Sequence, residues 1–130
     1  MQLLKLSSRS QYGLRLIVQI ARNCWGPMSI AEIAKKEKLS PKYLEEIVRA
    51  LKKSKLVTST RGAEGGYRLT KAPSAINLGE VIQALERPVK RLRVKDATLN
   101  VINQKISAGL ESSLSQTTLA DLVRELKNVC

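Results

Sequence analysis

Apolar residues recur at helical spacing near the start of the chain, between Ser8 and Asn23. The recurring positions are Tyr12, Leu14, Leu16, Ile17, Ile20 and Ala21. The opposite, polar face carries Arg9, Arg15 and Arg22. A stripe of this kind is normally buried, so the segment is predicted to be a scaffold helix. Tyr12 is expected in the core, with a phosphate contact as its alternative role.

A second, short helix is predicted after the break at Gly26-Pro27. Ser29 and Glu32 have the spacing of a capping box, in which two side chains satisfy each other's free backbone donors at a helix start. We therefore expect a helix over residues 30–37, followed by a turn.

A third helix is predicted over residues 41–53. Ser40 is a good N-cap, and Pro41 suits the first helical position. The inner face consists of Leu44, Ile47, Val48 and Leu51. The outer face carries Lys42, Tyr43, Glu45, Glu46, Arg49, Lys52 and Lys53. Two short helices with a basic second member are typical of a helix-turn-helix that places this helix in the DNA major groove, although an ordinary helical hairpin has the same spacing.

Two short strands are predicted next, over residues 56–60 and 67–70, because both are rich in residues that favour strands. The glycines between them allow the tip to adopt positive φ. Arg61 and Arg68 flank the tip, so the hairpin is predicted to be a wing that lies along DNA and puts an arginine into the minor groove. A nucleotide phosphate loop is disfavoured, because the Gly-Lys-Ser/Thr ending and the following helix are missing.

A long amphipathic helix is predicted over about residues 95–114. Its apolar stripe consists of Leu99, Ile102, Ile106, Leu110 and Leu114. Pairing with the same helix of a second subunit would bury the stripe, and packing on its own domain is the alternative. A last helix over residues 118–127 has four apolar residues that are expected to close the dimer core against the first helix, namely Leu119, Leu122, Val123 and Leu126.

The formal net charge of +12 is unevenly distributed. Residues 1–71 hold fifteen Lys and Arg against five acids, whereas residues 72–130 hold eight against six. The first part therefore has the electrostatic character of a nucleic-acid binder. A basic surface that serves only solubility is the alternative.

Length and composition disfavour several classes of protein. The 130 residues suit one domain, or a small domain with an appendage. The chain is predicted not to be an enzyme, because it has no histidine, no nucleophile motif and no paired-carboxylate pattern. No stretch approaches the roughly 20 apolar residues of a membrane span, and no secretory signal is found, so a cytoplasmic location is expected.

The chain has two cysteines, Cys24 and Cys130. With no histidine present, neither a disulfide framework nor an ordinary zinc site is expected within one chain. Cys24 is expected to be a small buried hydrophobe. Cys130 is expected to be an exposed thiol, with an intermolecular or redox role as its alternative.

Eight motifs together resemble the Rrf-two family of bacterial transcriptional regulators, in the expected order and over nearly the whole chain. They are Leu6-Ser, Tyr12-Gly-Leu-Arg, Ser29-Ile-Ala-Glu-Ile-Ala34, Tyr43-Leu-Glu45, Leu56-Val, Arg61-Gly-Ala-Glu-Gly-Gly-Tyr-Arg-Leu69, Leu78-Gly-Glu-Val-Ile82 and Thr118-Leu-Ala-Asp-Leu122. This family includes the iron–sulfur cluster regulator, the nitric-oxide-sensing repressor and the cysteine-metabolism repressor. The resemblance implies a homodimeric winged-helix DNA binder.

The resemblance also implies that the helix over residues 41–53 reads bases and that Glu45 helps to select the sequence. A carboxylate at that position can accept a hydrogen bond from cytosine N4. Its alternative, and that of Glu46, is a favourable interaction with the helix dipole. Tyr43 is expected either to stack on a sugar or to cap the core. The complete predicted DNA-binding set is Arg9, Lys42, Tyr43, Glu45, Arg49, Lys52, Arg61, Gly62, Gly65, Gly66 and Arg68.

The chain departs from the family pattern between Pro88 and Thr118. Many members have three closely spaced cysteines there, which ligate an iron–sulfur cluster, and this chain has none. We therefore expect no cluster, no metal and no other cofactor. The resemblance then points to members that respond to another signal, including those controlled by a partner protein. The basic residues of this interval are expected either to form a solvated linker or to bind an anionic effector or DNA backbone, and they are Arg87, Lys90, Arg91, Arg93 and Lys95.

Together these observations predict a mainly α-helical winged helix-turn-helix with a two-stranded wing and a long C-terminal dimerisation helix. Residues 1–86 are expected to form the DNA-binding domain, and residues 87–130 a basic linker and dimerisation region. The predicted function is that of a homodimeric regulator, most simply a repressor, on a palindromic operator with half-sites about 34 Å apart. A regulatory protein or a small molecule is the expected kind of effector. The alternative is a winged-helix module that binds a protein or RNA.

Overall fold

The computed structural model describes residues 6–23, 26–61, 65–86 and 96–126. Their elements, in chain order, are α1 (Ser8–Arg22), α2 (Ile30–Glu37), α3 (Pro41–Lys53), β1 (Val57–Thr60), β2 (Gly66–Leu69), the 3-10 turn η1 (Pro73–Ala75), α4 (Leu78–Leu85), α5 (Ala97–Gln116) and α6 (Leu119–Glu125). None of the helices that the structure describes is long and apolar enough to span a bilayer.

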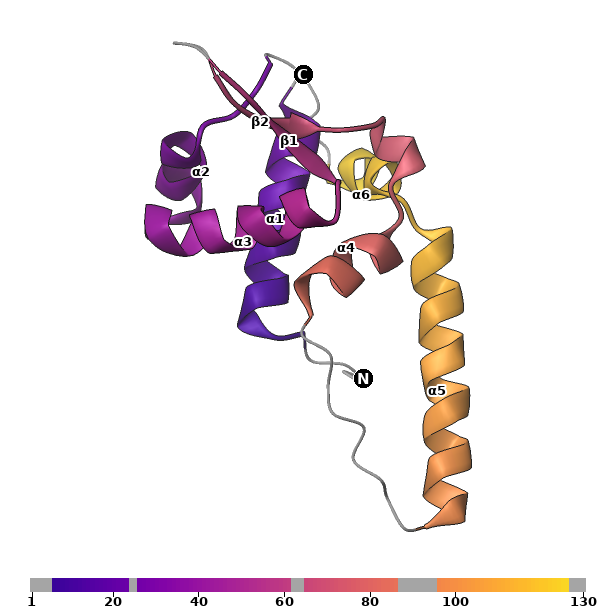
Figure 1. The fold of residues 1–130 in the computed structure, drawn as a ribbon. Coiled ribbons are helices and arrows are strands. Elements are labelled where there is room, and N and C mark those ends of the chain that lie inside the picture. Colours follow the sequence, from indigo (N-terminus) through magenta and orange to yellow (C-terminus); the bar gives the residue numbers. More distant parts are fainter. Residues whose placement is uncertain (1–5, 24–25, 62–64, 87–95, 127–130) are drawn as a thin grey trace.

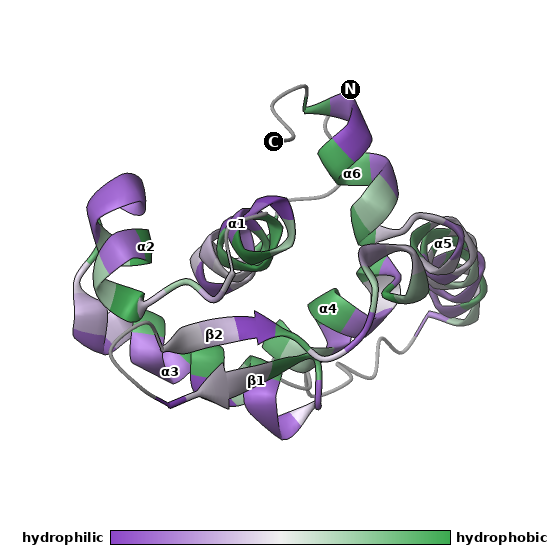
Figure 2. Cartoon of the chain, turned by 90° about the horizontal axis from the view of Figure 1, so that it is seen from above, coloured by the Kyte–Doolittle hydropathy of each residue, from purple (hydrophilic) through white to green (hydrophobic). Residues whose placement is uncertain are grey.

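The central helix of the fold is α1, which packs against α3, α4, α6 and β2 (Figures 1 and 2). Leu16 and Ile17 of α1 have no exposed surface. They belong to one hydrophobic cluster that receives buried side chains from the other helices except α5. The predicted scaffold role of α1 is therefore confirmed.

The helix-turn-helix forms where local sequence signals predict it. Ser29 Oγ accepts a hydrogen bond from the Glu32 N–H at the start of α2, and Ser40 Oγ accepts one from the Tyr43 N–H at the start of α3. Between the two helices Lys38 adopts a left-handed conformation with φ of 55°, which reverses the chain in a short turn. Both helices have the predicted bounds.

The wing is a two-stranded antiparallel hairpin, and the tip side of its strand β2 is bridged to Met28, two residues before α2. β1 and β2 pair from Val57 opposite Leu69 to Thr60 opposite Gly66. Met28 and Tyr67 exchange two backbone hydrogen bonds, of 3.0 and 2.7 Å. Gly66 allows this contact, because a Cβ there would collide with the Met28 carbonyl group. Gly66 does not have a positive φ, so the predicted reason for a glycine is wrong at this position.

α4 was not predicted as a helix from the sequence pattern. Its start is a capping box in which the Asn77 side chain accepts from the Glu80 N–H at 2.9 Å and Glu80 Oε2 accepts from the Asn77 N–H at 3.0 Å. Val81 and Leu85 are buried, and Leu85 packs so closely on Gly13 of α1 that a Cβ at Gly13 would collide with it. α4 also packs against α3, so it supports the recognition helix from behind.

α5 projects from the body of the molecule, and the chain then returns to the core through α6 (Figure 1). The return is fixed by two backbone hydrogen bonds, from Leu78 N–H to the Thr117 carbonyl at 2.8 Å and from Leu119 N–H to the Ile76 carbonyl at 2.9 Å. Leu119 has no exposed surface, and α6 packs on α1 of its own chain. The predicted contact between the last helix and the first is thus present within one chain.

Several predictions fall on residues outside the described part. These concern Cys24, Cys130, Gly62 and the basic residues of the interval 87–95. The division into two domains at residue 86 stays a prediction, and the return of α6 to α1 brings residues from both sides of it into one core.

Candidate nucleic-acid interface

The outer face of α3 presents a row of cations. Leu44, Ile47 and Leu51 on the inner face have no exposed surface. At 100° per residue, Lys42, Arg49 and Lys53 lie on the opposite side of the helix, and all three are exposed. Within the described part of the chain, none of these three cations forms an ion pair. They are therefore free to bind anions such as phosphate groups.

Two grooves lie on either side of this cationic row. The groove between α3 and β2 is lined by Glu45, Lys52 and Tyr67, among others. The groove on the opposite side is lined by Arg9, Glu46, Ala50 and Glu86, among others. Arg49 and Lys53 border both grooves. The two neighbouring glutamates of α3 therefore point to different sides, Glu45 toward the wing and Glu46 toward α1.

The wing continues the surface of α3. Arg68 lies on β2 opposite Thr58, and its side chain is exposed. Arg61 follows directly after β1 and is exposed as well. Lys52 Nζ donates a hydrogen bond of 3.4 Å to Ser59 Oγ of β1, which links the recognition helix to the wing. Lys52 therefore joins α3 directly to the wing.

The start of α1 adds a further cation to this surface. Arg9 is partly buried in the groove beside Arg49 and Lys53. Its Nε atom is buried and has no hydrogen-bond partner. The backbone around it is held by Ser7 and Ser10, whose hydroxyl groups donate to Glu86 Oε1 at 3.0 and 2.6 Å.

The charge of Glu86 is stabilised where it meets α1. The hydrogen bond from Ser10 is the main cause of a pKa below the ordinary value, and Ser7 adds to it, against a smaller opposing effect of burial. Glu86 is therefore an anion at neutral pH that fixes the start of α1 next to the cationic row.

Tyr43 has a structural role that the sequence left open. Its ring meets the ring of Tyr12 edge to face, with centroids 5.9 Å apart and planes at 86°. Both rings are partly buried and pack against the hydrophobic cluster. Core packing is confirmed for both tyrosines, whereas DNA contacts by them stay predictions.

Comparison with known proteins identifies the family. A family model described as "Iron-dependent Transcriptional regulator", Rrf2, matches residues 6–125. The chain belongs to the Rrf2 family. Rrf2 members among curated proteins include the HTH-type transcriptional regulator CymR of Bacillus subtilis, which is 36% identical with 92% of this chain and 89% of CymR covered. The regulator IscR of Klebsiella pneumoniae is 33% identical, with coverages of 92% and 80%.

Solved structures of Rrf2 regulators share the fold. The CymR structure from B. subtilis superposes with a TM-score of 0.81 at 36% identity, covering 95% of this chain and 98% of CymR. IscR from T. potens gives a TM-score of 0.83 at 34% identity, with coverages of 95% and 89%. The predicted winged helix-turn-helix with a long C-terminal helix is therefore confirmed. The chain is a DNA-binding transcriptional regulator of the Rrf2 family and not an enzyme.

The iron named in the Rrf2 description does not match the donor set of this chain. An iron–sulfur cluster takes several cysteine thiolates, sometimes with histidine, but the chain has two cysteines and no histidine. Within the described ranges, no group of three or more Cys, His, Asp or Glu residues could hold a metal ion. The residues of this chain therefore do not fit an iron–sulfur cluster.

Of the predicted site residues, Arg9, Glu45, Arg49 and Lys52 line the two grooves beside the cationic row. Gly62 lies outside the described part, and Gly66 closely approaches Met28. Sequence reasoning missed the link from Ser10 to Glu86, because residues 76 positions apart leave no local signal. Lys53 lies on the predicted outer face of α3 but is not in the predicted DNA-binding set. Because Lys53 borders the same two grooves as Arg49, it is a further candidate for DNA binding.

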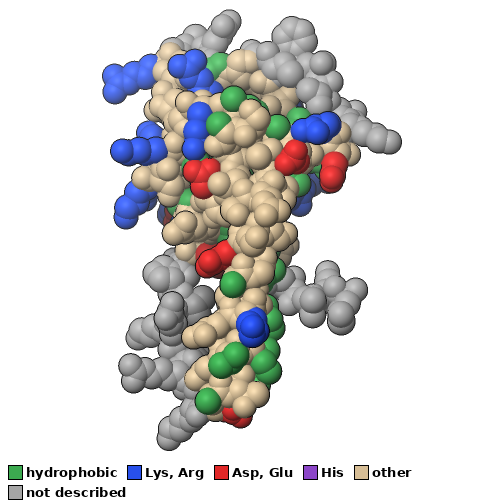
Figure 3. All heavy atoms as spheres, turned by 90° about the vertical axis from the view of Figure 1, so that its right-hand side faces the viewer, with side chains coloured by type: hydrophobic (Ala, Val, Ile, Leu, Met, Phe, Trp, Pro, Cys, Tyr) green, Lys and Arg blue, Asp and Glu red, His purple; other side chains and the backbone are tan. Residues whose placement is uncertain are grey.

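The apolar stripe of α5 is exposed over the first half of this helix, where no described part of its own domain buries it. None of the residues of α5 is buried. The exposed fraction is 48% for Leu99, 45% for Ile102 and 56% for Ile106. Figure 3 shows apolar side chains gathered along the lower part of α5, while most Lys and Arg side chains on this face lie over the upper body.

Proposed function

We propose that this Rrf2 regulator binds a palindromic DNA operator as a homodimer and represses transcription from the bound promoter. The main support is the row of Lys42, Arg49 and Lys53 on α3, which form no ion pair with any residue that the structure describes, beside a wing that is hydrogen-bonded to Met28. A major groove about 12 Å wide admits such a helix. The cations attract the phosphates on both sides of the groove.

The residues of the surface have different proposed roles. Phosphate contacts set the register of the protein on DNA, and base contacts select the sequence. We assign phosphate contacts to cations of α1 and α3, and minor-groove contacts to the wing, where Gly65 leaves room for the DNA backbone. The phosphate set is Arg9, Lys42, Arg49, Lys52 and Lys53, and the wing set is Arg61 and Arg68.

Glu45 is proposed to read a base. A carboxylate among cations weakens non-specific attraction to DNA, so its presence on the exposed face calls for a compensating contact. A hydrogen bond from cytosine N4 to the Glu45 carboxylate provides one in the major groove. Glu46 borders the groove on the α1 side of the cationic row, and we assign it no base contact.

A homodimer is supported by α5. The exposed stripe of Leu99, Ile102 and Ile106 would be buried by the same helix of a second chain. A two-fold axis then presents two α3 helices to half-sites about 34 Å apart. Occupation of a promoter by such a dimer would exclude RNA polymerase. We place this activity in the cytoplasm and expect its signal to be a regulatory protein or a small molecule.

The test is recovery of bound fragments from sheared genomic DNA, followed by affinity measurements on the best fragment at rising salt. Contacts with 6 to 10 phosphates should lower the affinity by about three to five orders of magnitude between 50 and 200 mM salt. A palindrome should emerge from the recovered fragments. Failure to retain DNA at low salt, or an affinity for protein or RNA that salt barely changes, would overturn the proposal.

A further inference from the structure

The carboxylate of Glu37 is more deeply buried than those of the other ion pairs that the structure describes. The exposed fraction of its side chain is 4%, compared with 38% for Glu80 and 40% for Asp121. A charged side chain at this depth needs a partner, because burial removes its hydration. The proposed DNA contacts do not involve Glu37. Its burial therefore requires a separate explanation.

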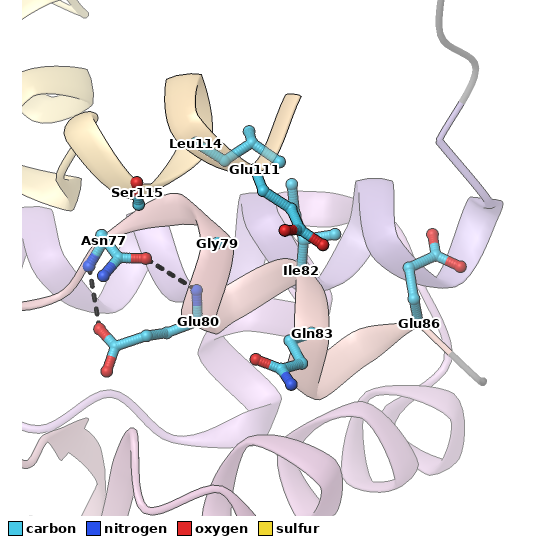
Figure 4. A pocket seen from close by; sticks show the side chains of 9 residues that line it. All are labelled: Asn77, Gly79, Glu80, Ile82, Gln83, Glu86, Glu111, Leu114 and Ser115. Atoms are coloured by element: carbon cyan, nitrogen blue, oxygen red, sulfur yellow. Dashed lines mark hydrogen bonds between the residues drawn. The ribbon is translucent and has the colours of Figure 1, made fainter. Parts of the chain in front are cut away.

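Glu80 and Asp121 stabilise the starts of their own helices, whereas Glu37 does not. Figure 4 shows the Glu80 side chain turned back toward Asn77, with which it forms the capping box of α4. Asp121 forms the corresponding capping box with Thr118 at the start of α6. Glu37 is instead the last residue of α2, where the helix dipole disfavours an anion. A benefit of Glu37 must therefore come from contacts outside α2.

The contacts of Glu37 lie on α1. Arg15 and Gln19 are one helical turn apart and share a face of α1. Arg15 Nη2 lies 2.7 Å from Glu37 Oε2. Since Oε2 accepts no hydrogen bond from the described residues, this contact is an ion pair without hydrogen-bond geometry. Gln19 Nε2 donates a hydrogen bond of 3.1 Å to Glu37 Oε1. These three side chains form one polar cluster between α1 and α2, the Glu37 cluster.

The Glu37 cluster ties the helix-turn-helix to the scaffold where few side chains are buried. Between the buried residues Ala34 of α2 and Leu44 of α3, the chain is anchored by the Glu37 side chain and by Leu39 and Tyr43, which are partly buried. α2 has eight residues and packs mainly on α3, and a helix of that length is not stable by itself. The Glu37 cluster therefore supplies a direct polar link from α2 to α1.

The Glu37 cluster is also close in sequence to the start of the recognition helix. Lys38 follows Glu37 with φ of 55° and closes the short turn, and Ser40 then caps α3. In a helix-turn-helix, residues near the start of the second helix contact base edges. Lys42 and Glu45 occupy that part of α3. A displacement of Glu37 is therefore passed through the turn to these two side chains.

We propose that Glu37 is a positioning residue for base recognition, held by Arg15 and Gln19 so that the start of α3 keeps a fixed place relative to α1. This inference rests on the proposed operator binding and assigns a part in sequence selection to a residue that touches no DNA. The core of α3 has its own buried residues, including Leu44 and Leu51. Loss of the Glu37 cluster should therefore misplace the start of α3 without unfolding the protein.

The first test compares affinity for the operator with affinity for a random duplex of equal length. Glu37→Gln removes the ion pair and keeps the size of the side chain, so operator affinity should fall about tenfold, as for the loss of one base contact. Affinity for the random duplex should stay equal or rise, because net charge drives this binding and one anion is lost. Glu32→Gln is the matched control, since Glu32 is exposed on the same helix and carries the same charge. Its ratio of the two affinities should equal that of the wild type.

Variants of Arg15 test the Glu37 cluster from α1. The Arg15 side chain is 61% exposed, so its replacement leaves the core intact. Arg15→Gln leaves the buried carboxylate without its cation and should lower the ratio of operator to random-duplex affinity about tenfold. Arg15→Lys keeps a cation near Glu37 and should retain most of the ratio. Adding Arg15→Gln to Glu37→Gln should cause little further loss, because both substitutions remove one contact.

The outcomes separate this inference from the proposed function. A wild-type protein that does not distinguish the recovered operator from a random duplex overturns sequence-specific binding and this inference with it. A discriminating wild type and a folded Glu37→Gln variant with the same ratio overturn the positioning role alone. An equal loss in Glu32→Gln assigns the effect to net charge and also overturns that role. Circular dichroism and thermal unfolding check the fold of each variant, and Arg15→Gln provides the test if Glu37→Gln does not fold.

Discussion

The hydroxyl group of Ser10 donates a 2.6 Å hydrogen bond to Glu86 Oε1 and thereby joins the start of α1 to the end of α4. Ser10 has no exposed surface, so water competes little for this bond. The contact fixes the turn of α1 that carries Arg9, one of the proposed phosphate contacts. Because the Glu86 carboxylate accepts this hydrogen bond as an anion, its protonation at low pH should weaken the fold.

The stability of the protein should therefore depend on Glu86 at low pH. The pKa of Glu86 is lowered in the fold, chiefly by the Ser10 hydrogen bond, from an ordinary value of 4.5. Its charge stabilises the fold above that ordinary value, and the contribution is lost as the pH falls through the lower folded pKa. Thermal unfolding of Glu86→Gln should change less over this acidic range than that of the wild type. An equally steep decline in both proteins would contradict this, and Glu125→Gln should behave as the wild type.

Removal of the arginine beside the wing tip should weaken operator binding without unfolding the protein. Arg61 is exposed after β1, so Arg61→Ala should cost about 1 to 3 kcal/mol of binding free energy and reduce the salt dependence. Titration of labelled operator measures both quantities. Arg124→Ala removes the same charge from α6 and should leave the affinity nearly unchanged. Equal losses in the two variants would point to net charge instead of a wing contact.

Glu45 should control sequence preference more than affinity. Glu45→Gln removes the anion that accepts from cytosine, so discrimination against a changed base pair should fall by about 1 to 3 kcal/mol. Competition between the operator and single-base variants measures this discrimination. Glu46→Gln removes the same charge on the side of α3 that faces α1 and should preserve the preference. If both variants keep it, the base contact lies elsewhere.

A charge in the apolar stripe should dissociate the proposed dimer. Leu110→Glu would bury an unpaired carboxylate between two helices, so sedimentation should find monomers with a low operator affinity. Val101→Glu places the same charge on the opposite face of α5 and should remain dimeric. A dimeric Leu110→Glu protein would remove the stripe from the interface.

The attachment of the wing should depend on the absence of a side chain at position 66. Gly66→Ala forces a Cβ against the Met28 carbonyl group, and we expect a loss of about 1 to 3 kcal/mol in unfolding free energy, together with weaker DNA binding. Chemical denaturation gives the first quantity. Thr60→Ala, on the residue paired with Gly66, should have a small effect. Unchanged stability in Gly66→Ala would mean that the backbone shifts without cost.

Elements with local signals were predictable from the sequence. α2 and α3 have serine caps at Ser29 and Ser40 and a clear apolar face, and both have the predicted bounds. α4 has an equally clear signal, a capping box of Asn77 and Glu80, but residues 78–82 enter the prediction from sequence only as a family motif, and no helix is predicted there. The pairing of an N-cap asparagine with a glutamate three residues later is a local signal that predicts this helix start.

The parts of the site that depend on distant contacts were not predictable. Nothing in the sequence connects Ser10 with Glu86, or Gly66 with Met28, because each pair meets only once α1 and the wing have packed. The glycine-rich tip suggested backbone freedom at Gly66, whereas the fold uses that position for a close approach. The apolar row of α5 was visible as a pattern, but its exposure required the structure.

Among the residues that the structure describes, none buries the first half of α5. From Ala97 to Gly109 every residue is exposed, and an isolated helix of about 12 to 15 residues is only marginally stable in water. A covering helix would therefore protect these amides from hydrogen exchange and make their protection rise with protein concentration. For this segment, ordering of the backbone and assembly of the regulator would be a single event.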